Sequence, residues 1–160
     1  MFGSTSGPAA ASVHRTALQE RAAPNNHGSW YLVQAIAIAR WTGHDELARE
    51  LCHEDKARIA RQFQSDGSQP EEIRRVDGLG YSRFNLDAQF QVAQLAAGTG
   101  VDLWHYTAPD GASLRRGLEF LMPYNAAPQT WPHSQHEKLP PGLLDELIAQ
   151  GRRAWPGLKS

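Results

Sequence analysis

The sequence has little cysteine, no long apolar run and almost no net charge, and each of these absences excludes a class of protein. With Cys52 alone, an internal disulfide framework is excluded. No apolar stretch approaches the length of a membrane-spanning helix. A formal net charge of −1 gives no positive field that would recruit a polyanion. We therefore expect no nucleic-acid partner and no membrane partner, and an acidic ligand would have to be held by local arginines.

The beginning of the chain also lacks the pattern of a secretory signal. Residues 1–12 are rich in Gly, Ser and Ala, without a positively charged start or an apolar centre. We expect residues 1–23 to be a flexible lead-in, with at most a short helical turn near residues 14–21. The remaining residues, 24–160, suit one globular domain, since the chain has 160 residues, of which 41% are hydrophobic and 21% charged.

Apolar residues recur at helical spacing along this domain and predict an all-α fold. The segment 30–42 is apolar nearly all round, which is typical of a buried helix, and Gly43 is placed to end it. Further helices are expected over 45–63 and 82–97, with a fourth that opens at Asp110 or Ser113 and runs to Met122, and a last one starting at Pro141. The prolines between residues 123 and 141 exclude regular helix there. The short connections favour antiparallel helical hairpins.

A polar cluster precedes the first of these helices. Asn25, Asn26 and His27 follow Pro24, and Ser29 is a plausible N-cap. Backbone N–H groups at a helix N-terminus attract anions, so the cluster suits a carboxylate-bearing ligand. The alternative is that the two asparagines only cap the helix and His27 satisfies them.

Four segments, in order, resemble signatures of the alginate lyase superfamily. They are Asn25–Tyr31 (N-N-H-G-[ST]-W-Y), Gly67–Arg75 (G-S-Q-P-x-E-x-x-R), Tyr81–Leu86 (Y-S-x-F-N-L) and Val101–Tyr106 (V-D-L-W-x-Y). The resemblance covers about residues 20–124. It implies a polysaccharide lyase with an (α/α) toroid fold, of which this chain would be the C-terminal half. It also implies a periplasmic or secreted location and an acidic polysaccharide as the partner, with no cofactor.

The resemblance assigns roles residue by residue. It implies that Asn26 binds the substrate carboxylate, that His27 neutralises it or acts as a base, and that Tyr81 transfers protons. Arg75 matches the arginine when positions are counted from Pro70, whereas counting back from Tyr81 keeps Arg74 as a candidate. The remaining expected substrate-binding residues are Asn25, Trp30, Gln69 and Arg74.

Other interpretations stay open for these residues. Tyr81 can be a half-buried aromatic with its hydroxyl in water, and Arg74 and Arg75 a solvated pair. The tryptophans can belong to the core rather than to a sugar cleft. No metal site is expected, because His133 and His136 lack partner ligands at a suitable spacing.

Two further expectations concern the whole chain. The main alternative function is a catalytically inactive helical fragment that binds carbohydrate or a protein partner. An open helical array would also expose apolar side chains at its end, so self-association is expected.

Overall fold

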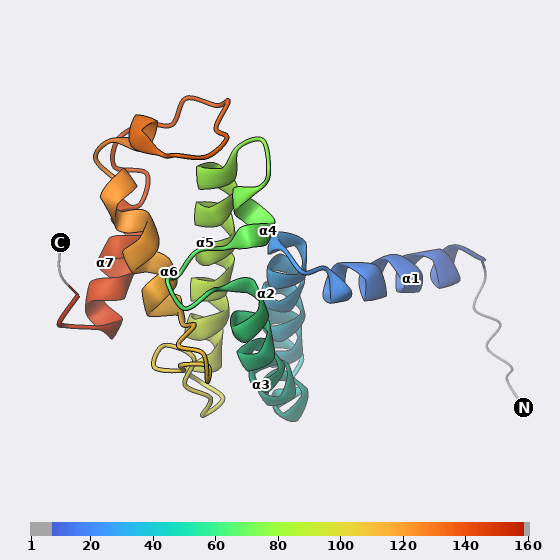
Figure 1. Cartoon of the computed structure of the whole chain (residues 1–160). Coiled ribbons are helices and arrows are strands. Elements are labelled where there is room, and N and C mark those ends of the chain that lie inside the picture. The colour runs from blue at the N-terminus through green and yellow to red at the C-terminus, as the bar shows by residue number, and fades with distance from the viewer. Residues whose placement is uncertain (1–7, 159–160) are drawn as a thin grey trace, which may run out of the picture.

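The computed structural model describes residues 8–158, and within them the chain is helical, which confirms the all-α prediction (Figure 1). The only β-type pairing in this range is an isolated bridge between Asp77 and Gln135. The α-helices are α1 (Pro8–Ala22), α2 (Asn26–Trp41), α3 (Asp45–Gln62), α4 (Pro70–Ile73), α5 (Gly78–Ala96), α6 (Leu114–Leu121) and α7 (Asp145–Ala154). Two 3-10 turns, η1 (Met122–Tyr124) and η2 (Pro128–Thr130), lie between α6 and α7.

Helices α2 and α3 form the predicted antiparallel hairpin, but α2 begins earlier than expected. Its N-cap is Asn25, whose side chain accepts a hydrogen bond from the backbone N–H of His27 at 3.2 Å. The prediction that Ser29 is the N-cap is wrong, because Ser29 lies inside the helix and is fully buried. Gly43, with φ at +76°, makes the turn after α2 as predicted.

The N-terminal segment is a helix rather than a flexible lead-in. Residues 8–22 form α1, which projects from the body of the molecule in Figure 1. The last carbonyls of a helix have no partner within it, and here the buried guanidinium of Arg58 supplies one. It donates to the carbonyl oxygens of Arg21 at 2.6 Å and Ala23 at 2.8 Å, which fixes the end of α1 against α3. The part of the predicted lead-in before residue 8 lies outside the described residues.

Gly28 is required because Arg58 and Ala23 approach the backbone of α2 closely at this position. It lies within α2, where a Cβ atom would come 2.1 Å from Nη1 of Arg58 and 2.4 Å from the carbonyl oxygen of Ala23. No side chain fits in that space. Gly28 therefore allows α2, Arg58 and the end of α1 to pack closely.

The core surrounds α5, which packs against α2, α3 and α6. Its largest buried side chains come from all four helices and from the segment between α3 and α4, and include Leu32, Ile36, Ile59, Phe63, Leu86, Phe90 and Leu118. Trp104 packs edge-on against both Phe90 and Trp155, and Trp131 is also buried. These tryptophans therefore belong to the core. Cys52 is fully buried, and burial raises the pKa of its thiol.

The proline-rich passage folds over the N-terminal end of α5. Asp77, just before α5, accepts hydrogen bonds from the backbone N–H groups of His136 at 2.9 Å and Glu137 at 2.7 Å. Pro141 does not start the last helix. Gly142, with φ at +83°, makes a further turn first, and α7 begins at Asp145.

Two large apolar side chains of α2 face solvent at the end of the helix. Ile38 is 61% exposed and Trp41 is 88% exposed. Helices that could cross a membrane are absent from the described part of the chain, where none is both long and apolar enough.

Candidate active site

A pocket of about 450 Å³ opens where the N-terminal ends of α2 and α5 meet α1 and the segment after α4. Five of the eight predicted site residues line it: Asn26, His27, Trp30, Arg75 and Tyr81. The other lining residues are Glu20, Tyr31, Gln34 and Phe84. The residues come from segments that are far apart in the sequence, and the fold brings them to one cavity.

Asn26 is held in place by a carboxylate that the sequence analysis did not single out. One oxygen of Glu72, Oε1, accepts from the backbone N–H of Asn26 at 2.6 Å, and Oε2 accepts from its side-chain Nδ2 at 2.8 Å. Both residues are buried. The two bonds fix the orientation of the Asn26 amide, so its second N–H and its carbonyl oxygen remain for a ligand.

Glu72 therefore takes the place that the sequence suggested for a bound anion. Its carboxylate lies at the N-terminus of α2, where N–H groups and the helix dipole favour negative charge. Burial raises the pKa of Glu72, and the hydrogen bonds from Asn26 oppose this rise. The end of α2 is already neutralised within the protein, so a ligand carboxylate needs other donors.

Arg75 supplies a cation beside Tyr81. Its guanidinium carbon lies 3.6 Å from the centroid of the Tyr81 ring, over the ring face. Attraction between a cation and an aromatic face fixes the two side chains relative to each other. Nη1 of Arg75 is 3.8 Å from Oε2 of Glu72, too far for a hydrogen bond, and it has no hydrogen-bond partner among the described residues. The Arg75 side chain as a whole is 29% exposed, so other parts of it can meet a ligand in the pocket.

His27 is oriented by Glu20, a residue of α1. Nδ1 of His27 lies 3.0 Å from Oε2 of Glu20. An ionised carboxylate only accepts hydrogen bonds, so Nδ1 carries the proton and Nε2 remains for the pocket. The histidine side chain is 54% exposed, which leaves it accessible to a ligand.

Three predicted site residues do not line this pocket. Asn25 caps α2. Arg74 is exposed and pairs with Glu71. Gln69 is 1% exposed, and its amide donates to the carbonyl oxygen of Ser82 at 3.0 Å and accepts from Asn85 at 2.8 Å. The structure thus separates the two candidate arginines, with Arg75 at the pocket and Arg74 away from it.

Gln69 belongs to a group of buried polar side chains below the pocket, which we call the polar layer. Its members are Ser29, Gln62, Gln69, Asn85 and Gln89, and each is at most 3% exposed. The Gln62 side chain is central, because its Oε1 accepts from Ser29 at 3.1 Å, Asn85 at 3.1 Å and Gln89 at 3.0 Å. Three of the four motif segments meet here.

Two residues that shape the pocket were missed in the sequence. The signal for Glu72 was present, since it is the fixed glutamate of the motif that ends at Arg75. No comparable signal marked Glu20, because its role depends on how α1, of which the sequence predicts only a short turn near residues 14–21, packs against α2. No group of three His, Cys, Asp or Glu side chains within the described residues is arranged to hold a metal ion.

This helical fold, with asparagine, histidine, arginine and tyrosine side chains around one pocket, matches known proteins. A model of the alginate lyase family matches residues 9–131. The crystal structure of an alginate lyase from Bacteroides ovatus is 33% identical in sequence, with a TM-score of 0.73. That alignment covers 93% of this chain and 37% of the other chain. A search of curated proteins found no match.

The chain belongs to the alginate lyase family. It spans little more than a third of the length of the Bacteroides ovatus structure, at 37%. The family match starts within α1 and reaches Trp131, so it extends beyond the segment from Glu20 to Tyr124 in which the resemblance was seen. Helix α1 is thus part of the matched region.

Proposed function

We propose that this protein is a polysaccharide lyase that cleaves a polymer of 4-linked uronic acids, alginate or a related polyuronate, by β-elimination. The observation that carries the proposal is the stacking of Arg75 on Tyr81 in the pocket that also contains Asn26 and His27. Family membership supports the same conclusion. It also supports action outside the cytoplasm, in the periplasm or as a secreted protein.

The reaction requires three events at one sugar unit. The carboxylate on C5 is neutralised, so that the C5–H bond can lose its proton to a base. Electrons from that bond form the C4–C5 double bond as the bond from C4 to the glycosidic oxygen breaks. The departing oxygen takes a proton from an acid. Hydrogen-bond donors aimed at the developing negative charge provide much of the stabilisation in such reactions.

The pocket contains groups suited to each event. The guanidinium of Arg75, the free N–H of Asn26 and the Nε2 side of His27 suit the carboxylate. The phenol of Tyr81 suits proton transfer to and from the substrate. Trp30, tilted against Phe84 with 4.9 Å between ring centroids, offers an apolar wall for a sugar ring.

The test is an elimination assay, because the product is a 4,5-unsaturated uronate that absorbs in the near ultraviolet. The chain is incubated with alginate, mannuronate-rich blocks, guluronate-rich blocks and glucuronan. We expect absorbance to rise with at least one of them, and Tyr81→Phe to lower the rate by about 10²- to 10⁴-fold, since it removes only the proton-transfer group.

Tyr106→Phe is the matched control, because Tyr106 lies outside the pocket beneath Lys56. It should keep the wild-type rate. Full activity of Tyr81→Phe would exclude the proposed mechanism. Binding of polyuronate without any absorbance change would instead indicate a carbohydrate-binding protein.

A further inference from the structure

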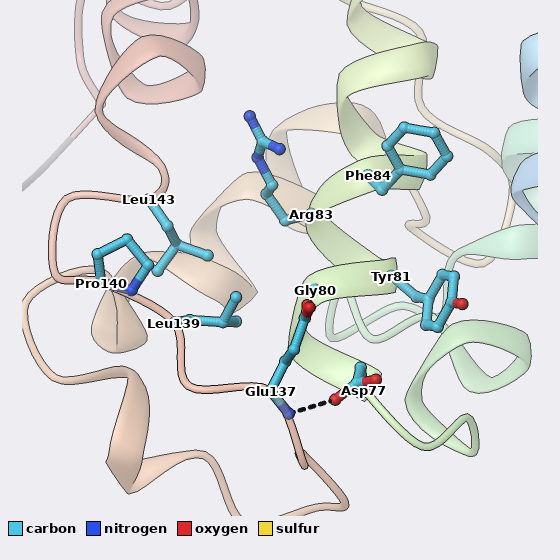
Figure 2. A pocket seen from close by; sticks show the side chains of 9 residues that line it. All are labelled: Asp77, Gly80, Tyr81, Arg83, Phe84, Glu137, Leu139, Pro140 and Leu143. Carbon is cyan, nitrogen blue, oxygen red and sulfur yellow. Dashed lines mark hydrogen bonds between the residues drawn. The ribbon is translucent and has the colours of Figure 1, made fainter.

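A second pocket of about 510 Å³ lies on the other side of Tyr81 and Phe84 from the candidate site. These two aromatic residues of α5 line both pockets, so they form a shared wall. The rest of the second pocket comes from the N-terminal part of α5 and from the end of the proline-rich passage (Figure 2). Tyr81 and Phe84 therefore lie at the boundary between two adjoining cavities.

Arg83 supplies a cation to this second pocket. Figure 2 shows its side chain on the pocket side of α5, whereas Tyr81 and Phe84 project from the opposite side of the helix. Its Nε is buried and has no hydrogen-bond partner among the described residues. A buried N–H group without a partner is unfavourable. The Arg83 side chain lines the pocket, and its guanidinium fork matches a carboxylate.

The two acidic residues of the pocket, Asp77 and Glu137, do not form an ion pair with Arg83. Asp77 uses its Oδ1 atom to hold the backbone N–H groups of His136 and Glu137. In Figure 2 the Arg83 guanidinium points away from both Asp77 and Glu137. Among the neighbouring arginines, Arg74 and Arg75 each lie close to a glutamate three residues earlier in the chain.

The remaining lining is apolar and suits the C–H face of a sugar ring. Leu139, Pro140 and Leu143 lie across the pocket from α5. An apolar wall combined with one well-placed polar group is the usual composition of a small-molecule site.

We propose that the second pocket binds a further uronate unit of the polymer, whose carboxylate is held by Arg83 while its ring packs on Leu139, Pro140 and Leu143. This inference rests on the proposed function, since it assumes a chain of uronates passing Tyr81. The pocket then sets a preference for acidic over neutral sugars next to the unit that reacts.

The test measures binding separately from turnover. Mannuronate and guluronate oligosaccharides of increasing length are titrated calorimetrically into the full chain carrying Tyr81→Phe, so that the ligand is not consumed. Arg83→Ala should weaken binding of the longer oligosaccharides by about 10- to 100-fold and that of dimers much less, because only the longer ligands reach both pockets. The affinity of Arg83→Lys should lie between those of the parent protein and Arg83→Ala, since lysine keeps the charge and loses the planar fork.

Two controls separate this effect from a general loss of charge or fold. Arg49→Ala removes an exposed cation of α3 that pairs with Glu46, and it should leave the affinity unchanged. Carboxyl-reduced oligosaccharides should bind equally to the Arg83→Ala and parent proteins. A thermal melt of each variant shows that it is folded, and Arg83→Gln replaces any variant that is not.

The outcomes distinguish this inference from the proposed function. If Arg83→Ala leaves the affinity unchanged at every oligosaccharide length, the second pocket does not bind a uronate through Arg83, even where turnover depends on Tyr81. If binding depends on Arg83 but the protein that retains Tyr81 shows no elimination, uronate binding in the second pocket is supported and the proposed lyase activity is rejected. Absence of binding by every oligouronate overturns both.

Discussion

The candidate site and the polar layer beneath it are built from the same short segments, yet their side chains are in opposite states. In the pocket, the side chains of Arg75 and His27 are 29% and 54% exposed. In the polar layer, Ser29, Asn85 and Gln89 are fully buried and bonded to one another or to Gln62. A polar residue in a family motif can therefore serve the ligand or the fold, and the exposure of its side chain shows which.

The two regions are also connected, because each of the three motif segments that meet in the layer also contributes at least one residue to the pocket. Ser29 follows Asn26 by about one helical turn, and Asn85 follows Tyr81 in the same way. The Gln62 amide also donates to the carbonyl oxygen of Asn25, at the start of α2. Locking the first turns of α2 and α5 together below the pocket holds the pocket residues in position.

The largest expected effect that would test this comparison is on stability. Gln62→Ala removes the amide that Ser29, Asn85 and Gln89 share, and it leaves buried polar groups unpaired beside a cavity. We expect the free energy of unfolding to fall by about 2–5 kcal/mol, measured by urea denaturation. Gln94→Ala, an exposed glutamine of α5, should change it by less than about 0.5 kcal/mol.

The same variant tests the division of roles. Under conditions where Gln62→Ala is folded, its elimination rate should fall only a few-fold and less than that of Glu72→Gln, because Gln62 acts on the pocket residues only through the first turns of α2 and α5. A loss of turnover without a loss of stability would place Gln62 with the pocket and break the comparison.

The next effect concerns the carboxylates that hold Asn26 and His27. Glu72→Gln replaces an acceptor of two hydrogen bonds with an amide that can accept only one of them, so the Asn26 amide loses its fixed orientation. We expect kcat to fall by about 10- to 100-fold, because small misplacements at a reacting centre are costly. Glu20→Gln, at the exposed partner of His27, should lower kcat only a few-fold, about the value of an exposed ion pair. Equal losses in steady-state assays would contradict the assigned roles.

The smallest effect is a change in the pH dependence of stability at the edge of the polar layer. Asp55 is fully buried and accepts from Gln89 at 3.3 Å. Burial raises its pKa from 3.8 to about 7, and Arg58 opposes that rise. Between these two values the folded state keeps a proton that the unfolded state has lost, so the free energy of unfolding falls as pH rises.

Asp55→Asn removes this titration. Urea denaturation between about pH 4 and pH 7 should show a shallower decline in the variant, by at most about 1.4 kcal/mol per pH unit. Parallel profiles would show that Asp55 is ionised throughout. The slopes are compared rather than the absolute stabilities, since the variant also leaves Arg58 without its counter-ion.

Much of the fold could be predicted from periodicity, because α2, α3, α5 and α6 bury regular apolar faces. Helix α1 could not, since its residues are small or polar and its end is fixed by a tertiary contact with Arg58. The start of α2 was misplaced for a related reason. Ser29 has the residue type of an N-cap, but Gln62, which is distant in the sequence, binds its hydroxyl instead.

Within the candidate site, the family motifs indicated the residue types, and the structure assigned their positions. Counting along the sequence could not choose between Arg74 and Arg75, because adjacent residues near the end of a short helix point in different directions. The roles of Glu72 and Gln69 depend on contacts with residues on other helices. Such pairings cannot be obtained from one segment at a time. The catalytic roles themselves stay predictions.

The hairpin of α2 and α3 has a consequence for how the protein can be altered. Both helices have one end at the site and the other at the turn made by Thr42, Gly43 and His44, far from α4 in Figure 1. The hydrogen bonds between Asn26, at the start of α2, and Glu72, after the end of α3, connect the two ends of the hairpin next to the site. The turn is therefore where a peptide tag or a connection to another domain can be inserted with the least effect on the reacting groups.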